Sequence, residues 1–177
     1  MDTTTLVFLW LFASLFMVHE FEEVVLVGAW KKRNMVYSST RNSKLTPYWA
    51  FVSTASFSCG VAEEWLLLLG ITAAALFFRN YFLWYGMLFA FTLHLVVLHL
   101  ILGSFFRRYV PGVVTAALFL LPSLLMLFYA ARGLHYGWQT ILLSALTGTI
   151  IAGVNLWLMH RAMPVFAHWL DQFASER

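Results

Sequence analysis

Apolar residues dominate five long stretches of this chain, and a short polar or turn-forming segment separates each stretch from the next. The five stretches run over about residues 5–30, 48–78, 81–106, 109–131 and 137–159. Each holds about 20 or more predominantly apolar residues, the length that an α-helix needs to cross the hydrocarbon core of a bilayer. The pattern therefore predicts an all-α bundle of five transmembrane helices, followed by a short amphipathic tail over residues 161–177.

The composition supports this reading of the pattern. Of the 177 residues, 62% are hydrophobic and 11% are charged, and the mean hydropathy is +0.79. A water-soluble domain of this length would expose much of that apolar surface to water. The connections are too short to fold alone, so we expect a single transmembrane domain over residues 1–177. The first stretch lacks the basic start and the cleavage site of a signal peptide, so we expect it to be retained.

The distribution of basic residues predicts an orientation in the membrane. When alternate loops are placed on one side, nine of the eleven Lys and Arg residues fall on that side and two fall on the other. The nine are Lys31, Lys32, Arg33, Arg41, Lys44, Arg107, Arg108, Arg161 and Arg177, and the two are Arg79 and Arg132. Because basic residues accumulate on the cytoplasmic side, the N-terminus is predicted outside and the C-terminus in the cytoplasm. The same bias explains the net charge of +3, so no nucleic-acid partner is expected.

Ionisable and polar side chains interrupt the apolar stretches at membrane depth. They are His19, Glu20, Glu22 and Glu23 in the first stretch, Glu63 and Glu64 in the second, His94 and His99 in the third, and Asn155 and His160 in the fifth. A charged side chain near the bilayer centre costs at least about 2.5–3.5 kcal/mol on insertion scales, so such groups indicate function. By helical rise they lie between the bilayer centre and a depth of about 10 Å below the cytoplasmic face, so one site can contain most of them.

Helical spacing places three of the four polar residues of the first stretch on one face. His19 and Glu23 are four residues apart, and Glu22 is three residues from His19. All three therefore project from the same side of a helix, whereas Glu20 projects about 100° away. This HxxEE face can chelate a metal ion.

Three pairs of polar residues in the later stretches align less simply. They are Glu63 with Glu64, His94 with His99, and Asn155 with His160. The two glutamates diverge by about 100°, so one can bind a metal while the other forms a hydrogen bond. The members of the other two pairs are five residues apart and diverge by about 140° on an ideal α-helix. Either a local π-bulge realigns such a pair or one member serves elsewhere.

These residue types together predict a metal site. Carboxylate and imidazole ligands suit zinc, iron or manganese, and the lone Cys59 provides no thiolate set for copper or an iron–sulfur cluster. The predicted metal ligands are His19, Glu23, Glu63, Glu64, His94 and His99, and the predicted acid–base or ligand-orienting residues are Glu22, Asn155 and His160. The number of ligands fits one divalent ion, or two as in the di-iron and di-manganese helix bundles.

We therefore expect a metal-dependent membrane enzyme, an oxidoreductase or a hydrolase, that acts on a lipidic or small apolar substrate reaching it through the membrane lipid. A proton-linked or metal-ion transporter is one alternative, although five spans without an inverted repeat favour it only if a homodimer supplies ten. A metal-free lipid-binding or isomerase-type acid–base enzyme is another. Taken singly, His94, His99 and His160 are also typical of histidines that form hydrogen bonds between membrane helices.

Four motifs carry a resemblance to a known family. They are HEFEE at His19–Glu23, AEEW at Ala62–Trp65, HLVVLH at His94–His99 and NLWLMH at Asn155–His160. Together they resemble the HXXEE-domain family of small bacterial integral membrane proteins over nearly the whole chain. The resemblance implies the same selection of residues and a location in the bacterial inner membrane, but no reaction, because the function of that family is not established.

Two looser similarities concern enzymes. The Glu-Glu pairs with later His and Asn residues resemble the CaaX-type intramembrane glutamate proteases, which carry an arginine four residues after the second Glu. Val27 and Leu68 stand at the corresponding places here, so the motif does not match. The number and type of polar residues also resemble five-span sterol-isomerase-type proteins, without a shared motif.

Overall fold

The computed structural model describes residues 3–34, 48 and 50–175, and all its regular elements within them are helices. The elements are α1 (Thr3–Arg33), α3 (Thr54–Phe78), α4 (Phe82–His94), the π-helix η2 (Leu95–Ile101), α5 (Leu102–Phe106), α6 (Val113–Gly133) and α7 (Trp138–Ser175). The predicted all-α class is confirmed. Arg41, Lys44 and Arg177, which contributed to the predicted orientation, lie outside the described residues.

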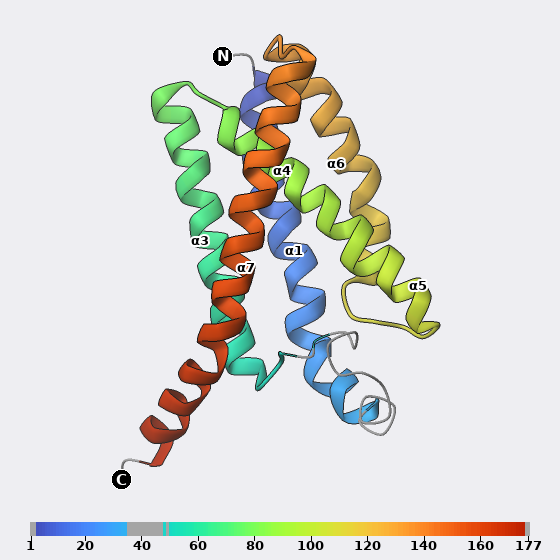
Figure 1. Ribbon diagram of the computed structural model, residues 1–177, viewed down its shortest axis with the longest axis vertical. Helices are drawn as coiled ribbons and strands as arrows, with labels where there is room; N and C mark the ends of the chain where they lie inside the picture. The colour runs from blue at the N-terminus through green and yellow to red at the C-terminus, as the bar shows by residue number, and fades with distance from the viewer. Residues whose placement is uncertain (1–2, 35–47, 49, 176–177) are drawn as a thin grey trace.

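The helices run lengthwise beside one another, with α4, η2 and α5 forming one continuous rod (Figure 1). The N-terminus lies at the same end as the α3–α4 and α6–α7 connections. The C-terminus, the end of α1 and the α5–α6 connection lie toward the other end. Helix α7 packs along α4 and α3, while α1 packs against α3 and α6.

Four helical segments are long and apolar enough to cross a membrane, which indicates a membrane protein. They are α3, the α4–η2–α5 rod, α6 and α7. Helix α1 is not among them, so the described residues contain four candidate spans where the sequence pattern predicted five. Its 31 residues include three carboxylates in the second half and end on Lys31, Lys32 and Arg33. These polar residues offset the hydropathy of its apolar first half.

Two helices have ends that differ from the ends of the apolar stretches in the sequence. Helix α3 begins at Thr54 rather than near residue 48, because Ser53 caps it: the Ser53 hydroxyl accepts a hydrogen bond from the Ser56 backbone N–H at 3.2 Å. The predicted fifth span and tail form one 38-residue helix, α7, which contains Pro164. At 1.5 Å per residue it is about 57 Å long, nearly twice the hydrocarbon thickness of about 30 Å.

A tightly packed apolar core fills the end of the bundle near the N-terminus. Leu9 and Phe12 of α1 pack there with Trp84, Leu88 and Phe91 of α4, and all five are nearly inaccessible. The Phe12 and Trp84 rings meet edge to face at 6.1 Å between centroids. This core fixes α1 against α4 and therefore positions the residues that follow Phe12 along α1.

Helices α4 and α7 meet at a pair of glycines. A Cβ atom on Gly148 would overlap the backbone of Gly86, and a Cβ on Gly86 would overlap the Ser144 carbonyl. The Ser144 hydroxyl also donates a hydrogen bond to the Phe82 carbonyl across this contact. Small residues allow membrane helices to approach closely, so these glycines determine how α7 lies on α4.

Replacing Gly148 with leucine should therefore separate α4 from α7. The overlap involves backbone atoms that cannot rotate away, so we expect the free energy of unfolding to fall by about 1–3 kcal/mol. Unfolding in mixed detergent measures this. Gly70→Leu is the matched control, because Gly70 lies in α3 with open space around it. An unchanged unfolding midpoint for Gly148→Leu would contradict the close contact.

Candidate metal centre

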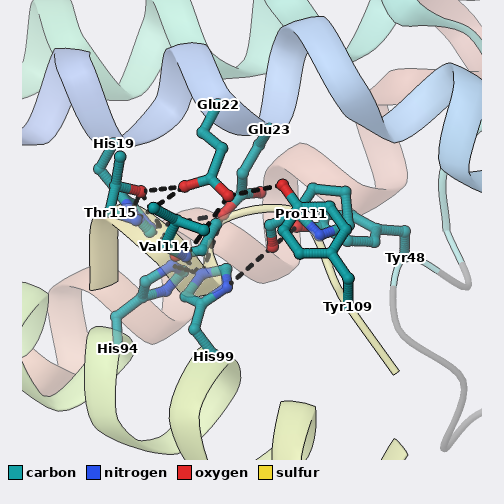
Figure 2. A network of polar contacts seen from close by, with 11 residues as sticks. His19, Glu22, Glu23, Tyr48, His94, His99, Tyr109, Pro111, Val114 and Thr115 are labelled. Atoms are coloured by element: carbon teal, nitrogen blue, oxygen red, sulfur yellow. Dashed lines mark hydrogen bonds and ion pairs between the residues drawn. The ribbon is translucent and has the colours of Figure 1, made fainter. Parts of the chain in front are cut away.

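Four of the six predicted metal ligands meet in one place. His19 and Glu23 project from α1, His94 ends α4 and His99 lies in η2. One ligand atom of each residue lies within 4.8 Å of the ligand atoms of the other three. Three of the four are buried, with exposed fractions of 0% for His19, 5% for Glu23 and 4% for His99, and His94 is partly buried. Figure 2 shows the histidine rings and the Glu23 carboxylate converging.

The π-helix explains how His94 and His99 share this site. Their five-residue spacing would separate them on an α-helix, but η2 begins immediately after His94 and includes His99. In a π-helix the backbone hydrogen bonds join residues five apart, which brings such residues to the same side. The two Nε2 atoms consequently lie 2.9 Å apart. The five-residue spacing allowed two arrangements for His94 and His99: a π-bulge that aligns them, or a separate role for one of them. The structure contains the π-helix, so both histidines face the same site.

The nitrogen and oxygen atoms of the group are in close contact. His99 Nε2 lies 3.2 Å from His19 Nε2 and 2.9 Å from Glu23 Oε1. His19 Nε2 lies 3.4 Å from the same oxygen. Glu23 Oε1 is buried and accepts no hydrogen bond from the described residues.

The hydrogen bonds around the group assign the protons of two histidines. His99 Nδ1 lies 3.2 Å from the Pro111 carbonyl oxygen, which can only accept, so Nδ1 carries the proton. His19 Nδ1 lies 2.8 Å from the Thr115 hydroxyl oxygen. That hydroxyl has one proton and lies 2.6 Å from Glu22 Oε2, to which it donates, so His19 Nδ1 must donate to Thr115.

Both assignments leave Nε2 without a proton in a neutral imidazole. The lone pairs of His19 and His99 and the Glu23 oxygen therefore point at one another, and electron pairs in contact repel. A metal cation, or a second proton on one of the imidazoles, relieves this repulsion. Histidines that bind metal ordinarily donate the other ring N–H to a carbonyl or, directly or indirectly, to a carboxylate, as His99 and His19 do. The residues present thus fit a divalent metal with three nitrogen ligands and one oxygen ligand.

The connection from α5 to α6 closes over the group. Gly112 begins α6 with φ +84°, a conformation that favours glycine, and a Cβ there would lie 2.8 Å from Glu23 Oε1 and overlap the His99 ring. Two hydrogen bonds hold the connection: Trp30 Nε1 donates to the Tyr109 carbonyl at 2.5 Å, and the Tyr48 hydroxyl donates to the Pro111 carbonyl at 2.8 Å. Burial raises the pKa of the Tyr48 phenol, and the nearby Glu23 carboxylate raises it further.

Glu22 binds the N-terminus of α6. Its carboxylate accepts hydrogen bonds from the backbone N–H groups of Val114 and Thr115, from the Thr115 hydroxyl and from the Tyr109 hydroxyl at 2.6 Å. Unpaired N–H groups and the helix dipole make such an end favourable for an anion. Partial burial and the bond to Glu22 raise the pKa of Tyr109. Glu22 therefore connects α1 to α6 and, through Thr115, orients His19.

The remaining predicted residues lie around the group. Glu63 is not among the four: both of its oxygens accept from Asn155 Nδ2 at 3.1 Å. Glu64 and His160 line a cavity of about 310 Å³ together with Glu23, His94 and His99. Glu63 thus forms a hydrogen bond, as was expected of one of the two adjacent glutamates, whereas Glu64 lies in the cavity and its role as a metal ligand stays a prediction.

Five further residues at the site had no assigned role in the sequence-based prediction. They are Glu20, Tyr48, Tyr109, Gly112 and Thr115. Glu20 was placed away from the HxxEE face, and it is indeed on another face, but that face lines the cavity. The dipeptide Pro111-Gly112 is typical of a tight connection, but nothing in the sequence pattern places that connection over His99.

The family comparison agrees with the earlier resemblance. No curated protein and no solved structure matches this chain. A family model described as a protein of unknown function with HXXEE motif matches residues 10–129, which include His19, Glu22, Glu23, His94 and His99 but not Asn155 or His160. Because the match spans more than half of the sequence and includes the motif itself, the chain belongs to this HXXEE family.

Proposed function

We propose that this protein is a membrane metalloenzyme in which His19, Glu23, His94 and His99 bind a divalent metal ion, and that it acts on a lipidic or small apolar substrate. The observation that carries the proposal is the convergence of imidazole nitrogens and a carboxylate oxygen in a largely buried space. The other nitrogens of His19 and His99 are held by hydrogen bonds, so the ring orientations suit metal binding.

Three nitrogen ligands and one oxygen ligand suit zinc, iron or manganese. Zinc would act as a Lewis acid and activate water for hydrolysis, whereas iron or manganese would support an oxidoreductase. The four residues suffice for one ion. A second ion would need the other predicted ligands, Glu63 and Glu64, and Glu63 is engaged with Asn155.

The predicted acid–base residues have distinct positions. His160 lines the same cavity as Glu23, where its imidazole can exchange a proton with a substrate. Glu22 orients His19 through Thr115, so we assign it a positioning role. Asn155 holds Glu63 between α7 and α3, and we propose that this contact sets the shape of the cavity.

The site is better arranged for an enzyme than for a transporter. The apolar core around Phe12, Trp84 and Leu88 closes the bundle between the metal ligands and the end near the N-terminus. A path for protons or ions would need polar groups or water through that region. The metal-free acid–base alternative would require protons to replace the metal between His19, His99 and Glu23.

We propose that α1 is a fifth span and that the protein lies in the bacterial inner membrane with its C-terminus in the cytoplasm. The outward side chains that flank the polar residues of α1 are apolar: Val18, Phe21 and Val25 are each more than half exposed. Lipid is the favourable environment for such a face, while its buried face carries His19 and Glu23 inward. The two chain ends lie at opposite ends of the bundle, as an odd number of spans requires (Figure 1).

Elemental analysis of protein purified in mild detergent tests the metal site. We expect about one equivalent of zinc, iron or manganese, and its loss in Glu23→Gln and in His99→Ala, because each removes one of four ligands. His168→Ala is the matched control, since His168 is exposed on α7 and contacts Gln172. Full metal content in a folded His99→Ala variant would contradict the assignment.

Thr115→Val tests how the ligand is oriented. Valine removes the hydroxyl between His19 Nδ1 and Glu22 but keeps the shape, so we expect metal affinity to fall by about 10–100-fold, as for other residues that support a metal ligand. Competition with a fluorescent chelator measures the affinity. Thr92→Val serves as control, because the buried Thr92 hydroxyl bonds only to the Leu88 carbonyl of its own helix. Equal affinities in the two variants would refute the role of Thr115.

Cysteine labelling in intact cells tests the orientation. In a Cys59→Ser background, which removes the only cysteine, we expect Gly133→Cys to react with a membrane-impermeant maleimide and Ser175→Cys to react only after permeabilisation. Gly133 and Ser175 are both exposed; Gly133 is the last residue of α6 and Ser175 is the last residue of α7, and these two helix ends lie toward opposite ends of the bundle (Figure 1). The reverse pattern would invert the orientation, and labelling of both in intact cells would contradict α7 as a span.

A further inference from the structure

Two cavities meet at a pair of carboxylates that the metal centre does not use. The metal-side chamber, about 310 Å³, borders Glu23 and His99. The apolar chamber, about 260 Å³, is lined by side chains such as Phe12, Phe16 and Met87. Glu20, Glu64 and His94 line both chambers, so these three residues stand at the junction.

Glu20 and Glu64 are enclosed carboxylates that find no partner among the residues the structure describes. Glu20 has an exposed fraction of 5% and Glu64 is partly buried, yet neither forms a hydrogen bond or ion pair with any of those residues. The two interact electrostatically with each other and with Glu23. A buried carboxyl group without a partner costs free energy, so a ligand that donates hydrogen bonds would relieve this cost.

The charges around the junction select the kind of ligand. Among the described residues, neither chamber is lined by lysine or arginine, whereas Glu20, Glu23 and Glu64 all border the metal-side chamber. An anionic head group would therefore meet like charges in an apolar surrounding. An ammonium or a neutral hydrogen-bond donor would be favoured, and the apolar chamber beside it would accept a hydrocarbon chain.

The apolar chamber opens toward lipid. Val97 and Leu93 line it and are each 38% exposed at the surface. On the opposite side, Gly153 of α7 lines it, is exposed, and has open space where a side chain would be. Helix α7 packs along α4 but makes no comparable contact with η2, which leaves the opening between them.

We propose that the two chambers form one binding site for a single-chain amphiphile with a cationic or hydrogen-bond-donating head group, which Glu20 and Glu64 hold while its chain occupies the apolar chamber. The ligand enters between α7 and η2 past Gly153. The assignment of this ligand as the substrate rests on the proposed function, in which the metal-side chamber receives the reacting group of the substrate. Glu20 and Glu64 are binding residues in this arrangement and not metal ligands.

Native mass spectrometry tests the proposal, because it counts bound metal and bound ligand on the same particle. The full-length protein is mixed with equal amounts of decylamine, decan-1-ol and decanoic acid. We expect one bound ligand, with the amine favoured over the acid by about tenfold or more. The carboxylates of Glu20 and Glu64 attract the ammonium group of the amine and repel the carboxylate of the acid. Equal binding of the acid, or no binding of any of the three, would overturn the proposal.

Variants separate this site from the metal centre. Glu20→Gln and Glu64→Gln should each reduce the preference for the amine while keeping the metal content of the unaltered protein. A metal ion lost in either variant, or an unchanged preference in the double variant, would overturn the assignment of these residues. Preference for the amine in protein that never carries metal would refute the proposed metal function and leave this binding site standing.

Blocking the opening tests the route. Gly153→Trp should reduce the binding of both the amine and the alcohol, because the indole would lie in the opening. Gly70→Trp is the matched control: Gly70 is also exposed, has open space around it and lines neither chamber. Equal binding by the two tryptophan variants would exclude entry past Gly153.

Discussion

A polar group inside an apolar bundle must find its partner within the protein, and this constraint determines how α1 meets α6 and η2. Glu22 is satisfied by the first turn of α6, His19 by Thr115 and His99 by the Pro111 carbonyl. The first two contacts join α1 to α6, which is distant in the sequence, and the third holds the α5–α6 connection against η2. A buried group that loses its partner costs about 1–3 kcal/mol. The contacts that pack the helices are thus the same ones that orient the candidate metal ligands.

The polar residues of the site form two groups with different surroundings. His19, Glu23, His94 and His99 face one another, and hydrogen bonds hold the Nδ1 atoms of His19 and His99, so little rearrangement is needed to bind an ion. Glu20 and Glu64 instead face open space. The apolar core around Phe12 and Trp84 lies on the far side and closes the bundle there. The site is therefore open at the side of the bundle, between α7 and η2, and is not open at both ends of the molecule.

Hydropathy predicted the all-α class, and helical spacing singled out the four residues that converge in the candidate metal centre. The HxxEE spacing placed His19 and Glu23 together, and the five-residue spacing of His94 and His99 allowed for the π-helix. The role of Thr115 could not be predicted, because it depends on how α6 packs against α1. The apolar stretch of the sequence ends before α7 does, for a different reason. Hydropathy shows where apolar residues stop, and an amphipathic helix continues beyond that point.

The seven residues of η2 have a further consequence. A π-helical segment accommodates one residue more than an α-helix of the same length, so removing a single residue between His94 and His99 would let the segment relax to α-helix. The two imidazoles would then be four residues apart, a spacing that still faces one side. The rest of the rod, including the α5 residues that lead to the Pro111-Gly112 turn, would keep nearly the same orientation relative to α4, because the π-helix already absorbs the extra residue. The ligand pair and the turn that closes over it would therefore both survive such a deletion. A deletion in the regular α-helix on either side would instead rotate everything beyond it by about 100°, so η2 is the place in this rod where the chain can lose one residue without displacing the enclosure of the site.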